Sequence, residues 1–486
     1  MSSADTTEFV IPLIIRGEII EDNLTSFGSR GNFAFKAPDP HHYLDRLVLP
    51  NPVAMEDLYA LSLTDIIDFM VELREHMYLE RNPYLQQALE ICIGASGSKT
   101  VDMVKGSFRA LPDMLRRESI EEILETNIGM RYLDGWSDST LKDGRTMAVR
   151  AFGARTAHII AGNGQSIALQ TILYNALTRG DAIVKLPSND PYFSTAVART
   201  MIEMAPDHPI NKHLTVAYWK GGDPVVESHL YDIKHIEKIV AWGGFDSMRS
   251  VRNYLQPGID LVALDPKLSG SVIGREAFAD EATMAEVAAL AARDIGYFNQ
   301  GGCVSARTLY IETGTDSAGI ALANSFGKLV YAAIQALPEH LSTPVPDFDP
   351  TLREEIDGIR YSEDFRVIGG RGNEGAIIVS QEDEQVDFSE RLNCRVANLV
   401  PVDSIAKAVG HLSIHCQTIG IYPNTLKTRI RDICALSGGQ RIVPLGYALA
   451  GTKVGPHDAI EPLRRMVRWI RDDTMTEVRG TLFADD

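Results

Sequence analysis

The most distinctive local pattern is a cysteine that follows two glycines, Gly301-Gly302-Cys303, between an expected helix and an expected strand. Glycines allow the backbone to approach a substrate closely and offer N–H groups to a developing oxyanion. Thiolates are strong nucleophiles, so Cys303 is a candidate acyl acceptor. The residues alone support a second interpretation equally well, a small buried thiol at a tight turn, because free cysteines are commonly buried.

The other four cysteines fit a structural role better. Cys92 lies in an apolar helical segment, and Cys394 and Cys434 have no distinctive neighbours. Cys416 follows His415, but adjacent residues on an element point in different directions, so this pair does not predict a catalytic dyad. No CxxC occurs, and we therefore expect neither a metal site nor a disulfide framework.

Asn163 follows an apolar segment that is typical of a buried strand, in Ala161-Gly162-Asn163-Gly164. Polar groups at the carboxyl ends of parallel strands face the crevice where such sheets bind ligands. The side-chain amide of Asn163 is a candidate donor to an oxyanion. Taken in isolation, the pattern favours a plain turn residue that tolerates a left-handed backbone.

Two further strand ends carry candidate cofactor ligands. Lys185 and Ser188, in Lys185-Leu186-Pro187-Ser188, suit a phosphate or a ribose. Trp242-Gly243-Gly244 ends a later strand and enters a helix, an arrangement that lets a cofactor approach the backbone and a helix N-terminus. The alternative interpretation of the first segment is ordinary loop chemistry.

Two segments imitate nucleotide-binding motifs. Gly370–Gly375 matches GxGxxG, but Ala376–Ser380 after it is typical of a strand where the motif requires a helix. We therefore expect a hairpin turn there. Gly94–Thr100 contains Gly-Ser-Lys-Thr without the full P-loop spacing, and we do not expect a nucleotide site there either.

The elements that must position these residues alternate between strand and helix from residue 156 onward. Such alternation predicts βαβ units and a parallel sheet covered by helices on both faces. The expected strands are Ala157–Ala161, Ala182–Lys185, Leu214–Trp219, Lys238–Trp242 and Asp260–Leu264. The expected helices between them are Gln165–Arg179, Phe193–Ala205, Pro224–Tyr231 and Phe245–Leu255.

The pattern divides the chain into three parts. We expect a cofactor-binding, Rossmann-like domain over residues 1–268, with a protruding hairpin arm near residues 140–156. A catalytic domain over residues 269–460 follows, opened by an alanine-rich helix over Asp280–Ile295. Residues 461–486 form the tail, in which Pro462–Asp473 is expected to be a basic amphipathic helix.

Composition limits the class of protein. The 486 residues carry a formal charge of −18, which argues against general affinity for nucleic acid or anionic membranes. A chain of this length exceeds one compact core, which predicts two or three domains. No apolar stretch is long enough to span a bilayer, and Met1–Glu8 lacks the features of a signal peptide, so we expect a cytoplasmic protein.

The order of Asn163, Lys185–Ser188, Gly243-Gly244 and Cys303 resembles the ordered motifs of the aldehyde dehydrogenase superfamily. The chain is most similar to the acyl-CoA reductase branch that includes the fatty-acid reductase of bacterial luminescence (LuxC type). That similarity covers nearly the whole chain and implies an α/β fold with a cofactor domain, a catalytic domain and a small oligomerisation arm. Its most distinctive segments are Ile11–Glu18, Ala241–Gly244, Asp265–Lys267 and Gln417–Pro423.

Three departures from the superfamily refine this expectation. Hydrolytic relatives carry a general-base glutamate where this chain has Ala263, so a thioacyl enzyme should not hydrolyse readily. Ser188 stands where NAD-preferring relatives place a carboxylate against the ribose, which favours NADPH, although NADH also fits. The ribose-binding glutamate of relatives is matched best by Asn393.

The resemblance implies NADPH-dependent reduction of an acyl-CoA, with a long chain, to an aldehyde through a Cys303 thioacyl enzyme. A homodimer or homotetramer built through the arm is also implied. Two alternatives stay open: a subunit that carries an acyl group on Cys303 for a partner protein, and a non-catalytic cofactor-binding scaffold. No second reductase domain is visible, which favours release of the aldehyde.

Overall fold

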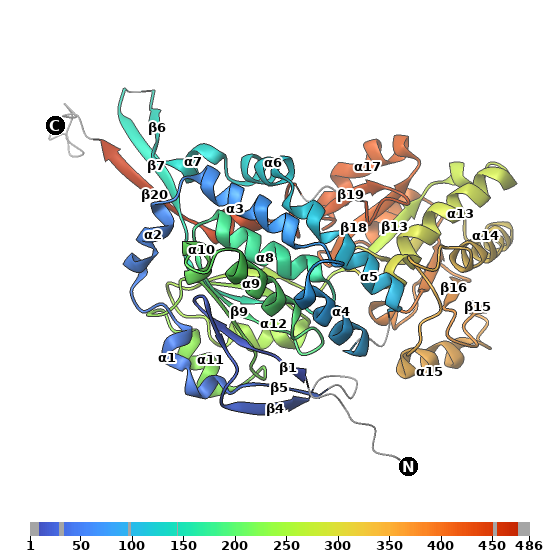
Figure 1. Cartoon of the computed structure of the whole chain (residues 1–486). Helices are drawn as coiled ribbons and strands as arrows, with labels where there is room; N and C mark the ends of the chain where they lie inside the picture. The colour runs from blue at the N-terminus through green and yellow to red at the C-terminus, as the bar shows by residue number, and fades with distance from the viewer. Residues whose placement is uncertain (1–8, 29–33, 96–98, 143, 451–453, 475–486) are drawn as a thin grey trace, which may run out of the picture.

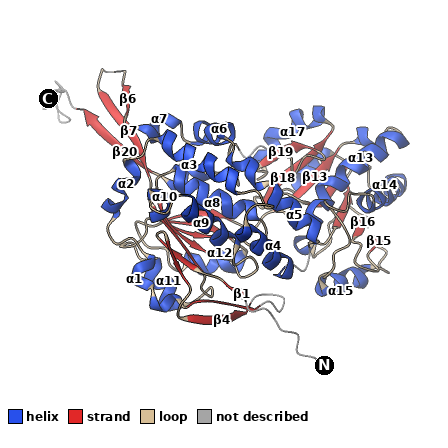
Figure 2. Ribbon diagram, in the orientation of Figure 1, coloured by secondary structure: helices blue, strands red, loops and turns tan. Residues whose placement is uncertain are grey.

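The computed structural model describes residues 9–28, 34–95, 99–142, 144–450 and 454–474. It contains two large sheets, each flanked by helices, and a narrow three-stranded ribbon that extends away from the body (Figures 1 and 2). Within the described residues no helix is both long and apolar enough to cross a membrane. The architecture therefore has the two α/β units and the protruding arm that the sequence predicts.

The first sheet has seven strands, five of which are parallel. The strands, in spatial order, are β12 (Asp260–Leu264), β11 (Lys238–Trp242), β8 (Arg155–Ile159), β9 (Asp181–Lys185), β10 (Leu214–Ala217), β2 (Leu13–Ile15) and β3 (Glu18–Ile20). The first five follow the strands predicted from the sequence, and β2 and β3 add an antiparallel hairpin at one edge.

Alternation along the strands places apolar side chains on both faces of this sheet. In β9, Ala182 and Val184 pack into one core cluster and Ile183 into the other. Helices on the first face are α3 (Leu63–His76), α8 (Gln165–Leu177) and α9 (Phe193–Met204), and helices on the second are α11 (Pro224–Leu230) and α12 (Phe245–Arg252). Helix α3 begins at a capping box in which Ser62 and Asp65 exchange hydrogen bonds.

Shorter elements complete this half of the molecule. The remaining helices are α1 (Leu44–Leu47), α2 (Glu56–Tyr59), α4 (Pro83–Ala95), α5 (Val101–Arg109), α6 (Arg117–Asn127), α7 (Met130–Asp134) and α10 (Pro209–Lys212). A small separate sheet is formed by β1 (Phe9–Val10), β5 (Ala34–Pro38) and β4 (Leu24–Gly28).

The second sheet also has seven strands and is parallel except for β15 at its edge. Its order is β15 (Phe365–Gly369), β16 (Ala376–Ser380), β17 (Val396–Pro401), β14 (Ala306–Ile311), β13 (Leu268–Ile273), β18 (Cys416–Tyr422) and β19 (Arg441–Pro444). The flanking helices are α13 (Glu281–Gly296), α14 (Ser317–Gln335), α15 (Pro350–Ile359), α16 (Ile405–Gly410) and α17 (Asn424–Leu436). Gly370–Gly375 joins the antiparallel pair β15 and β16, which confirms the predicted hairpin turn.

The arm contains β6 (Ser137–Thr140) and β7 (Thr146–Phe152), a hairpin that begins slightly before the predicted range. The predicted helix over Pro462–Asp473 is wrong beyond its first turn. Helix α18 (Pro462–Met466) is short, and β20 (Arg468–Thr474) pairs with β7 along seven residues. The edge of β7 offers backbone hydrogen-bond partners to residues 468–474, and Trp469 and Ile470 are residue types that favour strands. Strand pairing therefore outweighs the helical spacing of the apolar residues in this segment.

Candidate active site

Cys303 lies in a tight turn just before β14, and the backbone that leads into it is strained. Phe298, Asn299 and Gln300 all have positive φ, at 53°, 54° and 64°. Left-handed backbone at non-glycine residues is uncommon, and such strain concentrates at functional sites. The turn closes with a hydrogen bond from the Ser305 N–H to the Gly302 carbonyl at 3.1 Å.

Buried hydrogen bonds hold this turn in place from behind. The Gln300 side chain donates to the carbonyls of Ala306 (2.8 Å) and Val396 (2.9 Å) and accepts from the Val396 N–H at 3.0 Å. The Ser269 hydroxyl, from β13, donates to the Cys303 carbonyl at 2.6 Å and accepts from the Thr418 N–H at 3.0 Å. Strands β13, β14, β17 and β18 therefore fix the cysteine together.

The thiol of Cys303 is half-buried and faces polar groups. Burial raises its pKa above the ordinary value, while a hydrogen bond from Gln417 and the charge of Arg307 act to lower it. A nucleophile in this environment requires a nearby group to take its proton.

Gln417 connects Cys303 to a turn late in the chain. Its Nε2 donates to Oδ1 of Asp458 at 2.5 Å and lies 3.5 Å from Nε2 of His457. The His457 ring in turn lies 5.3 Å from the ring of Trp242. No sequence motif or periodic pattern surrounds His457 or Asp458, so they were not predicted as site residues. Gln417, in contrast, lies within one of the segments on which the family resemblance rests.

Asn163 and the Cys303 turn meet at Lys99. Nζ of Lys99 donates to the Asn163 carbonyl at 2.7 Å, and a Cβ built on Gly301 would lie 3.8 Å from Cε of the same lysine. The Asn163 side chain is exposed and makes no hydrogen bond with the described residues. Burial lowers the pKa of Lys99. Lys99 belongs to the Gly94–Thr100 segment, of which residues 96–98 lie outside the described part.

The predicted cofactor residues lie at the carboxyl ends of β9 and β11. Lys185 is half-buried, with its ammonium 5.4 Å from the centre of the Trp219 ring, and burial lowers its pKa to about 8. It donates no hydrogen bond to the described residues. Glu227, the nearest acidic influence, already accepts from the Trp219 indole (3.3 Å) and the Gly222 N–H (3.1 Å).

The other predicted cofactor residues differ in their exposure and in the free space around them. Ser188 is half-buried in the loop after β9. A Cβ on Gly243 would approach Ser247 to 2.9 Å, so this glycine allows α12 to pack closely, whereas a Cβ on Gly244 would meet nothing within 4 Å. The N-terminus of α12 therefore faces free space beside Trp242.

The positions that depart from the superfamily also have defined places. Ala263 lies in β12 directly beside Ala241 of β11, and no carboxylate stands there. Asn393 donates to the Arg391 carbonyl at 3.0 Å, and Leu392 next to it accepts from Nε of Arg307 at 2.9 Å. The Asn393 segment thus contacts the arginine whose charge acts on Cys303.

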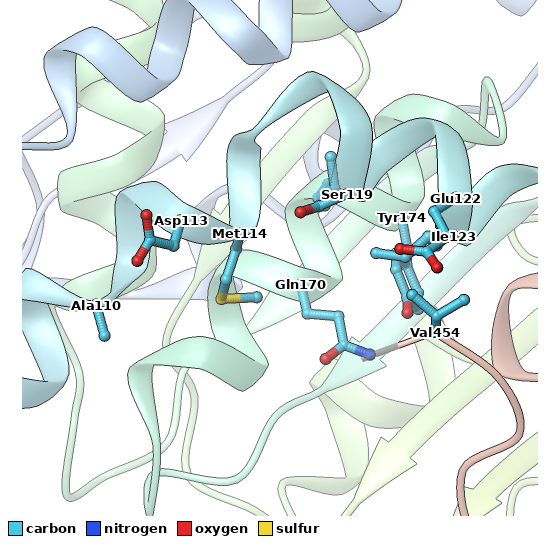
Figure 3. A pocket seen from close by; sticks show the side chains of 10 residues that line it. Ala110, Asp113, Met114, Ser119, Glu122, Ile123, Gln170, Tyr174 and Val454 are labelled. Atoms are coloured by element: carbon cyan, nitrogen blue, oxygen red, sulfur yellow. The ribbon is translucent and has the colours of Figure 1, made fainter. Parts of the chain in front are cut away.

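A cavity of about 380 Å³ lies beside α8, the helix that begins just after Asn163 (Figure 3). Met114, Gln170 and Tyr174 line its wall, and Val454, from the loop that leads to His457, closes one side. The volume falls within the range of small-molecule sites, roughly 300–1,000 Å³.

A family model described as acyl-CoA reductase (LuxC) matches residues 58–469, a span that contains every site residue named above. The chain belongs to this family. It is 26% identical over 493 residues to a protein of Vibrio harveyi named long-chain acyl-protein thioester reductase, and the alignment covers 98% of each chain. The family resemblance expected from the sequence is confirmed.

Solved aldehyde dehydrogenases share the fold of this LuxC-family chain. A lactaldehyde dehydrogenase superposes with a TM-score of 0.71 at 15% identity, over 97% of this chain and 100% of that one. The aldehyde dehydrogenase KauB from Pseudomonas aeruginosa gives 0.72 at 13% identity, over 96% and 97%. The chain is therefore a reductase built on the aldehyde dehydrogenase fold, as predicted.

Proposed function

We propose that this chain reduces a long-chain acyl thioester to the aldehyde, with NADPH as reductant and Cys303 as the acyl acceptor. The observation that carries the proposal is the placement of Cys303: a half-buried thiol on a strained, hydrogen-bonded turn between the two sheets, with Asn163 and Lys99 on one side and Gln417 on the other. A merely structural cysteine would not require this arrangement.

The thiol attacks the carbonyl carbon of the thioester, and the carrier departs as a thiol. Ala263 leaves no glutamate to activate water, so the acyl group stays on sulfur. This favours a reductase over an enzyme that oxidises aldehydes to acids.

The oxyanion formed during attack requires donors. The candidates are the Cys303 N–H and the side-chain amide of Asn163, which has no hydrogen-bond partner among the described residues, and Lys99 donates to the Asn163 carbonyl. Donors that are already in place stabilise the charge without reorganisation, which is the larger part of such catalysis.

The residues at the strand ends fit a nicotinamide dinucleotide. Gly244 leaves room at the N-terminus of α12, and the half-buried Lys185 ammonium donates no hydrogen bond to the described residues. Ser188 brings no charge that would repel a 2′-phosphate, which supports NADPH over NADH. When bound, the cofactor supplies hydride to the acyl carbon.

We assign the cavity beside α8 to the acyl chain. Residues Gln170–Tyr174 lie about 7 to 14 Å along α8 from its first turn, by the helical rise, and this turn adjoins Asn163. A chain that starts at Cys303 and follows α8 would reach Met114 and Ile123. This placement supports a long rather than a short acyl group.

The carrier of the acyl group is decided by experiment. We would incubate the protein with labelled palmitoyl-CoA, or with a palmitoylated carrier protein, and map the label to a peptide by mass spectrometry. Label on Cys303 supports the proposal, and the faster of the two donors identifies the carrier class. Absence of label on Cys303 from both donors contradicts it.

A protein carrier is the second candidate because the Vibrio harveyi relative is named for an acyl-protein substrate. In that case a partner protein would deliver the acyl group, and CoA esters would react slowly. The arm supports a further proposal, that β20 and the β6–β7 hairpin join copies of this chain into a dimer or tetramer, which light scattering would measure.

A further inference from the structure

The turn His457-Asp458-Ala459-Ile460 is more constrained than a connecting loop requires. The N–H of His457 donates to the Ile460 carbonyl at 2.8 Å, and the Ile460 N–H donates back at 3.0 Å. The two central residues, Asp458 and Ala459, both have positive φ, 51° and 60°. Glycine and asparagine prefer such positions, so an alanine in this conformation lowers the stability of the fold. Backbone strain of this kind is concentrated at functional sites.

This turn directs two titratable side chains at the amide that contacts Cys303. The Gln417 side chain lies close enough to the Cys303 thiol to lower its pKa. The adjacent Thr418 N–H shares the Ser269 hydroxyl with the Cys303 carbonyl. Nε2 of Gln417 donates to Asp458 and lies 3.5 Å from Nε2 of His457. Gln417 is therefore a neighbour of both His457 and the Cys303 thiol. The Asp458 side chain is 4% exposed, whereas His457 is 38% exposed and can exchange protons with solvent.

We propose that His457 is the proton-transfer group of acyl transfer, with Asp458 and Gln417 as positioning residues. The proposal rests on the proposed function. As the Cys303 sulfur bonds to the thioester carbon, its proton passes to Nε2 of His457. The bond from that carbon to the carrier sulfur then breaks, and the imidazolium returns the proton to the departing thiolate, so the step consumes neither water nor redox equivalents.

The surrounding charges suit a base that is neutral at physiological pH. Burial lowers the pKa of His457, and Arg441 and Lys267 act in the same direction. Asp458 opposes them and stabilises the transient imidazolium. The same carboxylate raises the pKa of Cys303, so it hinders a free thiolate while it supports proton transfer through His457.

The test measures single-turnover acylation of Cys303 by palmitoyl-CoA without cofactor, by the mass of the intact protein and by release of CoA thiol. His457→Asn should slow acylation about 100-fold, and free imidazole should restore part of the rate in His457→Gly. Asp458→Asn should shift the acid limb of the rate profile to lower pH. His415→Asn, a histidine that contacts Phe245 outside this cluster, is the matched control.

The outcomes separate the two claims. If wild-type protein is never acylated at Cys303, the proposed function fails and this inference falls with it. If wild-type and His457→Asn proteins are acylated at equal rates, the inference alone is overturned. A slow His457→Gly variant that imidazole does not restore, with an unchanged pH profile in Asp458→Asn, overturns it as well, because a purely structural role predicts that result.

Discussion

The ammonium of Lys99 donates a 2.7 Å hydrogen bond to the backbone carbonyl of Asn163, and its aliphatic stem lies against Gly301. One side chain thus connects the Asn163 loop of the first sheet with the Cys303 turn of the second. In the proposed mechanism, this contact holds the Asn163 backbone beside the Cys303 turn.

We expect Lys99→Met to lower kcat/KM for the acyl thioester about 10- to 100-fold, since displacement of an oxyanion donor has effects of this size or larger. The affinity for NADPH, measured by fluorescence, should change little. Lys105→Met, in helix α5 shortly after Lys99 and without a hydrogen bond to the described residues, is the control. Equal kinetics of both variants would show that Lys99 does not position Asn163.

Ala263→Glu should introduce hydrolysis of the thioacyl enzyme, because a carboxylate in β12 would stand where the superfamily holds its general base. The expected result is fatty acid formed from palmitoyl-CoA in the absence of NADPH, at a rate above that of wild type. Ala263→Gln, which has the same size without a basic group, should not gain this activity. Equal acid formation by both variants would argue against the assignment of this position.

Ser188→Glu should reduce the preference for NADPH over NADH about tenfold, which corresponds to 1.4 kcal/mol. The new carboxylate would repel a 2′-phosphate near Lys185. The ratio of kcat/KM values for the two cofactors measures this effect, with Ser188→Gln as the uncharged control. An unchanged ratio would remove Ser188 from the cofactor site.

Gln170→Trp should shift the preferred acyl length toward shorter chains, because Gln170 lines the cavity beside α8 (Figure 3). Gln170→Ala should leave the longest chains at least as active. A series of acyl-CoA esters from C6 to C18 gives the profile. If the profile of the tryptophan variant matches wild type, the acyl chain lies elsewhere.

Stability in acid should depend on Asp181, which is fully buried. Burial acts to raise its pKa, but His213 (2.9 Å) and Arg16 outweigh burial and lower the pKa. Because the pKa of Asp181 is lower in the folded than in the unfolded state, its ionised form stabilises the fold at pH values above the unfolded-state pKa of about 3.9. This stabilisation is lost as the pH falls through the folded-state pKa. Asp181→Asn should cost about 3–5 kcal/mol at neutral pH and flatten this dependence in denaturant titrations, unlike the exposed control Asp246→Asn.

Much of the fold could be read from the sequence because buried parallel strands are short apolar runs with clear helical segments between them. The five parallel strands of the first sheet and the Gly370–Gly375 hairpin were predictable for this reason. The strand in the tail could not be predicted, because the conformation of Trp469 and Ile470 depends on pairing with β7, which lies more than 300 residues earlier in the chain. Local periodicity contains no information on such a partner.

The site was only partly predictable. Cys303 and Asn163 carry local signals, a glycine-flanked thiol and a strand-end amide. His457 and Asp458 carry none, and their role depends on a turn that folds back beside Gln417. Lys99 lies in a segment that was considered only as an incomplete nucleotide-binding motif, so its sequence context offered no reason to place it beside Asn163.

The most direct test of the central claim compares wild-type protein with Cys303→Ala in a reaction with palmitoyl-CoA and NADPH. Nicotinamide oxidation, free CoA and fatty aldehyde are followed together, and Cys416→Ala serves as a cysteine control. We predict equal amounts of the three products from wild type and from Cys416→Ala, and none from Cys303→Ala, which should still bind NADPH. Aldehyde formation by Cys303→Ala would contradict the account.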